Sequence, residues 1–188
     1  KLMGWLALDR ALRIADTHPL SERQRRRWQK ARDAIAAEVR SRGFDPTIGS
    51  YVRSYGSPEL DAALLVLPLL DLDSVESPQV QGTIDAIRDR LSAGDSLLYR
   101  YPPGHDGNPG GEGAFLPCSF WLVQALARSG RRAEAVELFQ SLLDYASPLG
   151  LYSEELDPAT GAHLGNFPQT LTHAALVQAA LAIRDAPG

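Results

Sequence analysis

The sequence is dominated by segments with helical spacing of apolar residues, in which amphipathic segments alternate with strongly apolar ones and glycine- and proline-rich loops separate them. Apolar residues recur at helical spacing over 1–16 and again from the capping box of Ser21 and Gln24 to Gly43. Residues 58–70 are apolar almost throughout, which is typical of an inner, buried helix. Further helices are expected at 78–94, 114–128, 131–145 and 168–184.

This alternation predicts an all-α fold of about seven helices, with the apolar segments inside and the amphipathic ones outside. Long loops on one side of such helices suggest a toroid of helical hairpins, and seven helices are a little over half of a twelve-helix (α/α)6 barrel. An internal echo supports a repeat: residues 44–49 resemble residues 156–161, and the first of these lies in a hairpin-like excursion from 43 to 55. An ordinary α-solenoid would give the same echo.

The composition fits one globular domain. The 188 residues are 44% hydrophobic and 22% charged, which is enough for a buried core. A net charge of −4 argues against a nucleic-acid or anionic-membrane surface and favours a neutral partner. The basic run from Arg23 to Arg27 is therefore interpreted as a solvated helix face. Cys118 is the only cysteine, so no internal disulfide is possible, and we expect a cytoplasmic protein. No cofactor is expected.

Two loops hold the candidate chemistry. The loop at 95–113 carries Arg100 between Tyr99 and Tyr101, a forked donor beside aromatic faces that suits a sugar. The loop at 147–167 carries the acidic pair Glu154-Glu155 in a setting punctuated by glycine and proline. Loops on a rigid scaffold are where catalytic groups concentrate, so both loops are expected at one end of the helices, facing one concave surface.

The motifs in these loops resemble those of the bacterial family 15 glycoside hydrolases, which include glucoamylases and trehalases. The likeness runs in order through most of the chain, in Tyr55-Gly56-Ser57, Leu60-Asp61-Ala62, Leu97-Leu98-Tyr99-Arg100-Tyr101-Pro102, Cys118-Ser119-Phe120-Trp121-Leu122, Gly150-Leu151-Tyr152-Ser153-Glu154-Glu155-Leu156-Asp157-Pro158 and Gly165-Asn166-Phe167-Pro168-Gln169. The resemblance implies an inverting hydrolase of α-glucosidic bonds, acting on starch-type α-glucosides or on trehalose.

The resemblance also implies roles for individual residues. Glu154 matches the general base, and Glu155 would bind the sugar or orient the base. The motif alone leaves both assignments of the base open, to Glu154 or to Glu155. Arg100 resembles the arginine that hydrogen-bonds glucose in the first subsite. The other expected substrate-binding residues are Tyr101, Trp121, His173 and Asp61.

One element of the family pattern is missing. The general acid of the family follows a tryptophan on an earlier loop, but Trp5, Trp28 and Trp121 are not followed by glutamate. We therefore expect residues 1–188 to be the C-terminal portion of a single barrel, inactive without the N-terminal half as partner, with a glucose-containing oligosaccharide or disaccharide as ligand. Residue 63 is also alanine where the family commonly has serine. Self-association into a homo-oligomer is left open.

Two other functions remain as alternatives. A non-catalytic helical-repeat module for protein interaction or carbohydrate binding would need only the apolar inner helices and acidic outer ones. A metal hydrolase would use His163, His173 and Asp157, but these residues lack the spacing of a known zinc motif, and no metal ligand is assigned.

Overall fold

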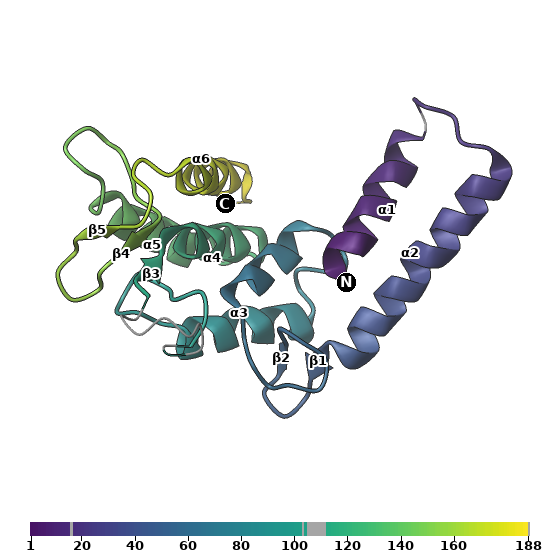
Figure 1. Ribbon diagram of the computed structural model, residues 1–188, viewed down its shortest axis with the longest axis horizontal. Coiled ribbons are helices and arrows are strands. Elements are labelled where there is room, and N and C mark those ends of the chain that lie inside the picture. The colour runs from purple at the N-terminus through teal and green to yellow at the C-terminus, as the bar shows by residue number, and fades with distance from the viewer. Residues whose placement is uncertain (16, 103, 105–111, 188) are drawn as a thin grey trace.

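The computed structural model describes residues 1–15, 17–102, 104 and 112–187, and this part of the chain is mostly helical (Figure 1). It contains six α-helices, one 3-10 helix and five two-residue strands. The helices are α1 (Leu2–Ile14), α2 (Glu22–Arg42), η1 (Ala62–Leu69), α3 (Pro78–Arg90), α4 (Leu116–Arg128), α5 (Arg132–Leu143) and α6 (Thr170–Asp185). The strands are β1 (Phe44–Asp45), β2 (Ser50–Tyr51), β3 (Ala114–Phe115), β4 (Glu155–Leu156) and β5 (His163–Leu164).

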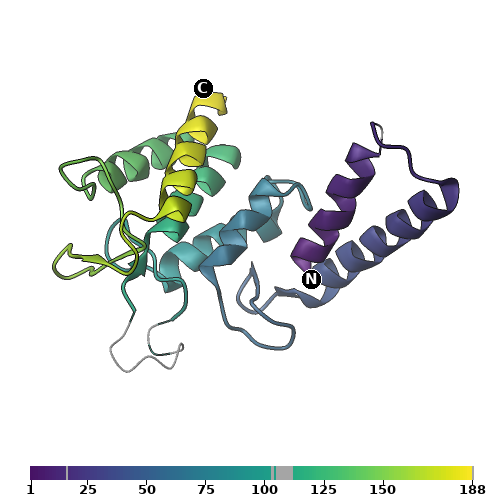
Figure 2. The same cartoon turned by 45° about the horizontal axis from the view of Figure 1, so that its top comes forward.

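Helices α1 and α2 form an antiparallel hairpin that projects from the rest of the chain (Figures 1 and 2). The expected capping box is present, since the Ser21 hydroxyl accepts from the Gln24 amide and the Gln24 side chain accepts from the Ser21 amide. The outer part of the hairpin is solvated, and Arg23 and Arg27 lie exposed on α2, as predicted.

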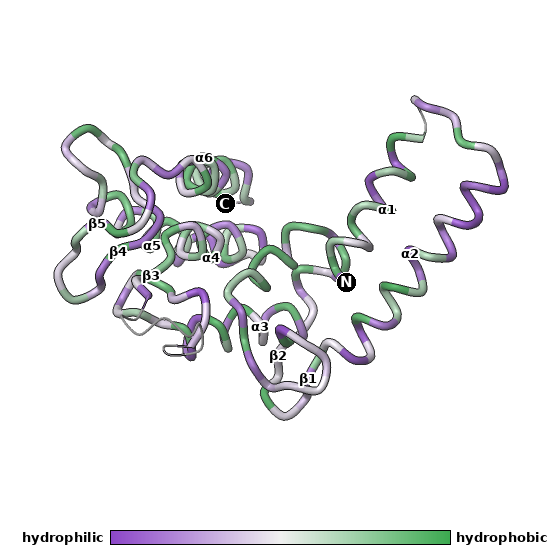
Figure 3. Tube along the Cα trace, in the orientation of Figure 1, coloured by the Kyte–Doolittle hydropathy of each residue, from purple (hydrophilic) through white to green (hydrophobic). Residues whose placement is uncertain are grey.

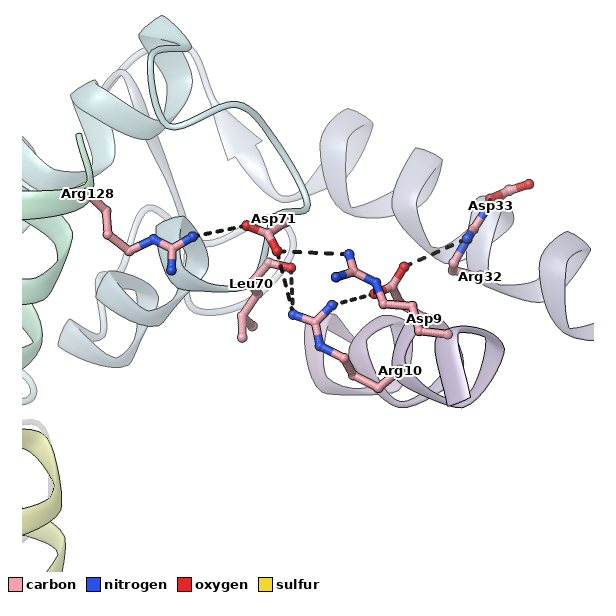
Figure 4. Close-up of polar contacts among 8 residues, drawn as sticks. Asp9, Arg10, Arg32, Asp33, Leu70, Asp71 and Arg128 are labelled. Carbon is pink, nitrogen blue, oxygen red and sulfur yellow. Dashed lines mark hydrogen bonds and ion pairs between the residues drawn. The ribbon is translucent and has the colours of Figure 1, made fainter. Parts of the chain in front are cut away.

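An ion-pair network joins the α1–α2 hairpin to the segment after η1 and to α4 (Figure 4). The Asp9 carboxylate of α1 is buried and is flanked by Arg10 at 2.5 Å and Arg32 at 3.7 Å. Arg10 also lies 3.8 Å from Asp71, which in turn accepts from Arg128 of α4 at 3.2 Å. Asp71 has a φ of 62°, a left-handed conformation that turns the chain after η1. The network therefore connects α1, α2, the segment after η1 and α4.

The prediction of a helix over 58–70 is wrong in the extent and the type of the helix. Residues 58–61 are not helical, and Ala62–Leu69 form a 3-10 helix that starts where the Asp61 carboxylate accepts the Ala63 amide at 2.8 Å. Pro68 lies inside this segment and disfavours a regular α-helix there, because its ring would clash with the carbonyl of residue 64. The segment is nevertheless apolar and partly buried, as expected of an inner element.

Helix α4 is the centre of the core. It packs against α5, α6 and η1, and it is the most deeply buried helix, with Phe120, Val123 and Leu126 inaccessible to solvent or nearly so. In Figure 3 the tube of α4 carries more green, hydrophobic residues than that of α2, which is largely purple. The prediction of an apolar inner helix here is confirmed, apart from residues 114–115, which form a strand.

Helix α6, expected among the apolar helices that line the inside, is only partly buried. Its buried residues are small, namely Thr172, Ala175 and Ala179, while Val177 and Leu181 are 54% and 42% exposed. One side of α6 packs on α4, and the other side faces solvent in this chain.

Both Asp-Pro segments of the internal echo form hairpin turns of the same design. The Asp45 carboxylate accepts the Thr47 amide at 2.8 Å, and the Asp157 carboxylate accepts the Ala159 amide at 2.9 Å. Each turn ends on a glycine with positive φ, at 64° and 70°. The first turn joins β1 to β2 and confirms the excursion at 43–55, and the second joins β4 to β5 inside the expected loop at 147–167.

Remaining boundaries move by a few residues. Helix α3 ends at Arg90 rather than near Gly94, because Ser92 forms a bridge with Leu98. Residues 103 and 105–111 of the expected loop lie outside the described residues. Across the described part of the chain, none of the helices combines the length and apolarity that a bilayer crossing requires.

Candidate active site

A three-stranded sheet brings the two candidate loops together. Its strand order is β3-β4-β5, with Phe115 opposite Glu155 and Glu155 opposite Leu164. The Phe115 amide donates to the Leu98 carbonyl at 2.8 Å, so the segment leading to Arg100 continues beside β3. Residues 98–100 and 154–156 therefore lie on either side of β3, next to the first residue of α4.

Glu154 directly precedes β4 and is half-buried. Its Oε2 accepts from the side-chain Nδ2 of Asn166 at 2.9 Å and from the Asn166 amide at 3.2 Å. The Glu154 carbonyl accepts the Leu116 amide at 3.1 Å, which ties the residue to the start of α4. The backbone of the glutamate is thus fixed by the core helix, and its carboxylate by the segment after β5.

Glu155 turns toward the opposite edge of β4. Its Oε2 accepts the Gly113 amide at 3.0 Å, on the β3 side, whereas the carboxylate of Glu154 lies on the β5 side. A Cβ on residue 113 would lie 2.7 Å from the Leu156 carbonyl oxygen and 3.1 Å from the Glu155 Cβ, so only glycine fits there. The adjacent glutamates therefore occupy different environments, although they are neighbours in the sequence.

Arg100 is held between an acid and two aromatic rings. Its Nε lies 3.7 Å from the Asp61 Oδ1, and its guanidinium carbon lies 5.1 Å from the centre of the Tyr101 ring and 5.7 Å from that of Phe115. The Arg100 carbonyl accepts the Ala62 amide at 3.0 Å, which docks this segment on the start of η1. Phe115 is the direct link between the arginine and β4, because it also pairs with Glu155. A second guanidinium, that of Arg53, lies 4.7 Å from the Tyr101 ring.

His173 and Trp121 lie on helices rather than on the loops. The His173 Nε2 accepts the Tyr152 amide at 3.2 Å, and the two rings meet edge to face at 5.7 Å. Tyr152 in turn packs edge to face on Phe120 of α4, and burial raises the pKa of its phenol. Trp121 is partly buried against the core. His173 thus supports the segment leading to Glu154 through Tyr152.

Sequence reasoning missed the polar residues that support this segment. Ser153 is fully buried, and its hydroxyl donates to the Glu155 carbonyl at 2.6 Å and lies 2.8 Å from the His163 Nδ1. The Thr172 hydroxyl donates to the Ser153 carbonyl at 2.8 Å. Asn166 lies within one of the motifs that carry the family resemblance, but that motif does not indicate a role for it. Its position after a glycine in a polar loop gave no signal that its side chain returns to Glu154.

The three residues of the metal alternative have separate roles. His163 contacts Ser153, His173 contacts Tyr152, and Asp157 shapes the β4–β5 turn, where the hydroxyl of Thr160 keeps the pKa of that carboxyl below its usual range. Over the described ranges, no cluster of three or more His, Cys, Asp or Glu side chains is arranged to hold a metal ion.

Comparison with known proteins identifies the family. The family model "Glycosyl hydrolases family 15" matches residues 1–181. The chain belongs to this family. It is 42% identical to a trehalase of Mycolicibacterium smegmatis over 95% of its length, 39% identical to a trehalase of Thermoplasma volcanium over 99%, and 31% identical to Trehalase 1 of Sulfolobus acidocaldarius over 100%. These matches cover 27%, 30% and 30% of the relatives, so the family 15 chain spans between a quarter and a third of their length.

Solved structures agree with the fold. A glycosidase has a TM-score of 0.74 at 21% identity, and the match covers 89% of this chain and 47% of the other. A glutamate-to-alanine variant of a glycosidase in complex with glucose has a TM-score of 0.72 over the same shares. The all-α expectation is therefore confirmed, with the helices arranged as in part of the (α/α)6 barrel of family 15 glycosidases.

Proposed function

We propose that this chain is the C-terminal portion of one (α/α)6 barrel catalytic domain in an inverting glycoside hydrolase that cleaves α-glucosidic bonds. Family membership supports hydrolysis of glycosides, and relatives named trehalase make trehalose the first substrate to test. The share of the relatives that the chain spans supports an N-terminal half elsewhere in the full-length protein, and the exposed face of α6 offers it a surface. That half would supply the general acid. Membership in an enzyme family weighs against a non-catalytic interaction module.

The observation that carries the proposal is the environment of Glu154. A general base must present an ionised oxygen to a water molecule. Donors from Asn166 reach Oε2 of Glu154 and fix the position of the carboxylate, so that its other oxygen can face a water molecule. In the inverting mechanism, this carboxylate takes a proton from the water that attacks the anomeric carbon. The general acid on the opposite face of the sugar, typically ~6.5–9.5 Å from the base, protonates the leaving oxygen.

The remaining candidates then have roles in binding or support. Arg100 would donate hydrogen bonds to the glucose at the first subsite, oriented by Asp61, while Tyr101 supplies an aromatic face. Glu155 would bind the sugar or orient the base from its position beside β3.

His173 would contribute through Tyr152, on which it packs, and Trp121 would contact the sugar from α4. The support for His173 is its contact with Tyr152, and the support for Trp121 is its place on α4, whose first residue is bonded to the Glu154 carbonyl.

The stereochemistry of the products tests this proposal in the full-length protein. Trehalose joins two α-glucose units through their anomeric carbons. Inverting attack at one carbon therefore releases one β-glucose and one α-glucose, whereas retention releases α-glucose only. Proton NMR during the first minutes of hydrolysis, before mutarotation, should find both anomers in equal amounts. An exclusively α product would contradict the inverting mechanism, and absence of hydrolysis of trehalose, maltose and isomaltose would contradict the function.

A further inference from the structure

The segment Gly165-Asn166 wraps around Glu154 through three hydrogen bonds. The Glu154 amide donates to the Asn166 carbonyl at 2.9 Å, and the amide and side-chain nitrogen of Asn166 both donate to Glu154, at 3.2 and 2.9 Å. Both donors to the carboxylate reach the same oxygen, Oε2. Oε1 receives neither of these bonds.

Gly165 allows the close approach. Its φ is 69°, and a Cβ at this position would lie 3.0 Å from both the Cβ and the Oε2 of Glu154. Any other residue would therefore meet a strained backbone conformation and a steric contact at the same time. Glycine lets the backbone of Asn166 reach the carboxylate directly.

The polypeptide on both sides of Asn166 is anchored to the residues that precede Glu154. On one side, His163 lies 2.8 Å from the Ser153 hydroxyl. On the other side, the Gln169 amide donates to the Tyr152 carbonyl at 2.9 Å and the Thr172 hydroxyl donates to the Ser153 carbonyl at 2.8 Å. Because these anchors flank it, Asn166 is fixed relative to the glutamate and is not free to swing with a loose loop.

We infer that Asn166 is a positioning residue that holds Glu154 through Oε2 and so leaves Oε1 as the atom that accepts the proton from water. This inference rests on the proposed function, in which Glu154 is the base. A carboxylate without the side-chain donor rotates about its last bond, and misplacement of a reacting group by about 1 Å costs on the order of 10²-fold in rate. Asn166 contributes to turnover in this way without touching the sugar.

The test uses the full-length enzyme with Asn166→Ala and Asn166→Asp. We expect Asn166→Ala to lower kcat by about 10- to 100-fold with little change in KM. Asn166→Asp keeps the size but replaces the NH2 donor by an oxygen and sets a second carboxylate against Oε2, so its kcat should fall at least as far as that of the alanine variant, again with little change in KM.

Thr160→Ala is the matched control. It removes one side-chain hydrogen bond to a carboxylate in the same hairpin, that of Asp157 at 2.7 Å, but does not touch Glu154. It should leave kcat and KM unchanged. If Asn166→Ala does not fold, kcat and KM of the isosteric Asn166→Asp variant test the inference.

Two results would overturn the inference. One is a wild-type kcat in both Asn166 variants, and the other is an equal fall of kcat in the Thr160 control. Glu154→Gln separates this failure from failure of the proposed function. If Glu154→Gln loses turnover while the Asn166 variants behave as wild type, only the positioning role is wrong. If Glu154→Gln keeps turnover, the base has been assigned wrongly.

Discussion

Replacement of Asp61 separates two roles that the structure gives to one carboxylate. Its Oδ1 accepts the Ala63 amide at 2.8 Å, which caps η1, and the same oxygen lies 3.7 Å from the Nε of Arg100. Asp61→Ala removes both interactions. Asp61→Asn keeps an acceptor of nearly the same shape and therefore keeps the cap, but it removes the charge opposite Arg100.

The magnitudes follow from this geometry. Loss of a helix cap costs about 1 kcal/mol, so Asp61→Ala should lower the thermal midpoint of the full-length enzyme by about 1–2 °C, since the shift per kcal/mol falls with chain length. Asp61→Asn should stay close to wild type. The ion pair is partly exposed, at 16% for the acid and 39% for the arginine, and pairs of this kind contribute ~0.2–1 kcal/mol. If the effect of Asp61 on binding passes through Arg100, KM should rise by at most about 5-fold in both variants.

Steady-state kinetics with trehalose and a thermal-shift assay measure the two effects. A hydrogen bond from the sugar to Asp61 itself would be worth ~1.5–3 kcal/mol, so its loss would raise KM by about 10- to 150-fold. A rise of that size would refute the positioning role and make Asp61 a direct sugar ligand. Equal destabilisation by alanine and asparagine would refute the cap. Asp45→Ala is the control, because it removes the equivalent bond to the Thr47 amide in the distant β1–β2 turn and should leave KM unchanged.

Three further predictions concern the scaffold. Gly82→Ala should lower the thermal midpoint clearly, because its Cβ would lie 2.2 Å from the Gly49 carbonyl oxygen, and overpacking of this kind costs ~1–3 kcal/mol; an unchanged midpoint would contradict the close packing of α3 on the turn. Hydrogen bonding to Arg131 holds the pKa of Glu134 at about 2, below its ordinary value of 4.5. Wild type should therefore be more stable than Glu134→Gln at neutral pH, and this difference should vanish as the pH falls from about 4.5 to 2. A difference in denaturation midpoints that stays constant with pH would refute this. Burial raises the pKa of the Cys118 thiol, so mass spectrometry should find that residue unlabelled by iodoacetamide in the native enzyme and labelled after unfolding.

Periodicity was sufficient to predict the helices that bury a large face. Helix α4 is apolar on nearly all sides and was predicted within two residues, because few other structures bury such a segment. The segment at 58–70 looks similar in the sequence, but it contains Pro68 and folds as a short 3-10 helix that begins at the Asp61 cap. Local backbone chemistry decided that outcome, and average apolarity does not report it.

The candidate site depended on contacts that no spacing reveals. The motifs placed Arg100 and Glu154 in two loops, but they were silent on the Phe115 strand that joins them. Asn166 follows Glu154 by twelve residues and reaches it only because the β4–β5 hairpin reverses the chain. Pairing across a turn is a tertiary property, and the sequence offered only the Asp157 turn as a hint of it.

The replacement of Glu154 by glutamine tests the central claim most directly. The amide keeps the size of the side chain but cannot take a proton from water, so kcat of the full-length enzyme on trehalose should fall by about 10²–10⁴-fold while KM changes far less. Glu155→Gln, at the neighbouring position, is the matched control and should retain substantially more turnover. Near-normal kcat in Glu154→Gln together with its loss in Glu155→Gln would contradict the account and place the base one residue later. Normal turnover in both variants would remove the acidic pair from the mechanism.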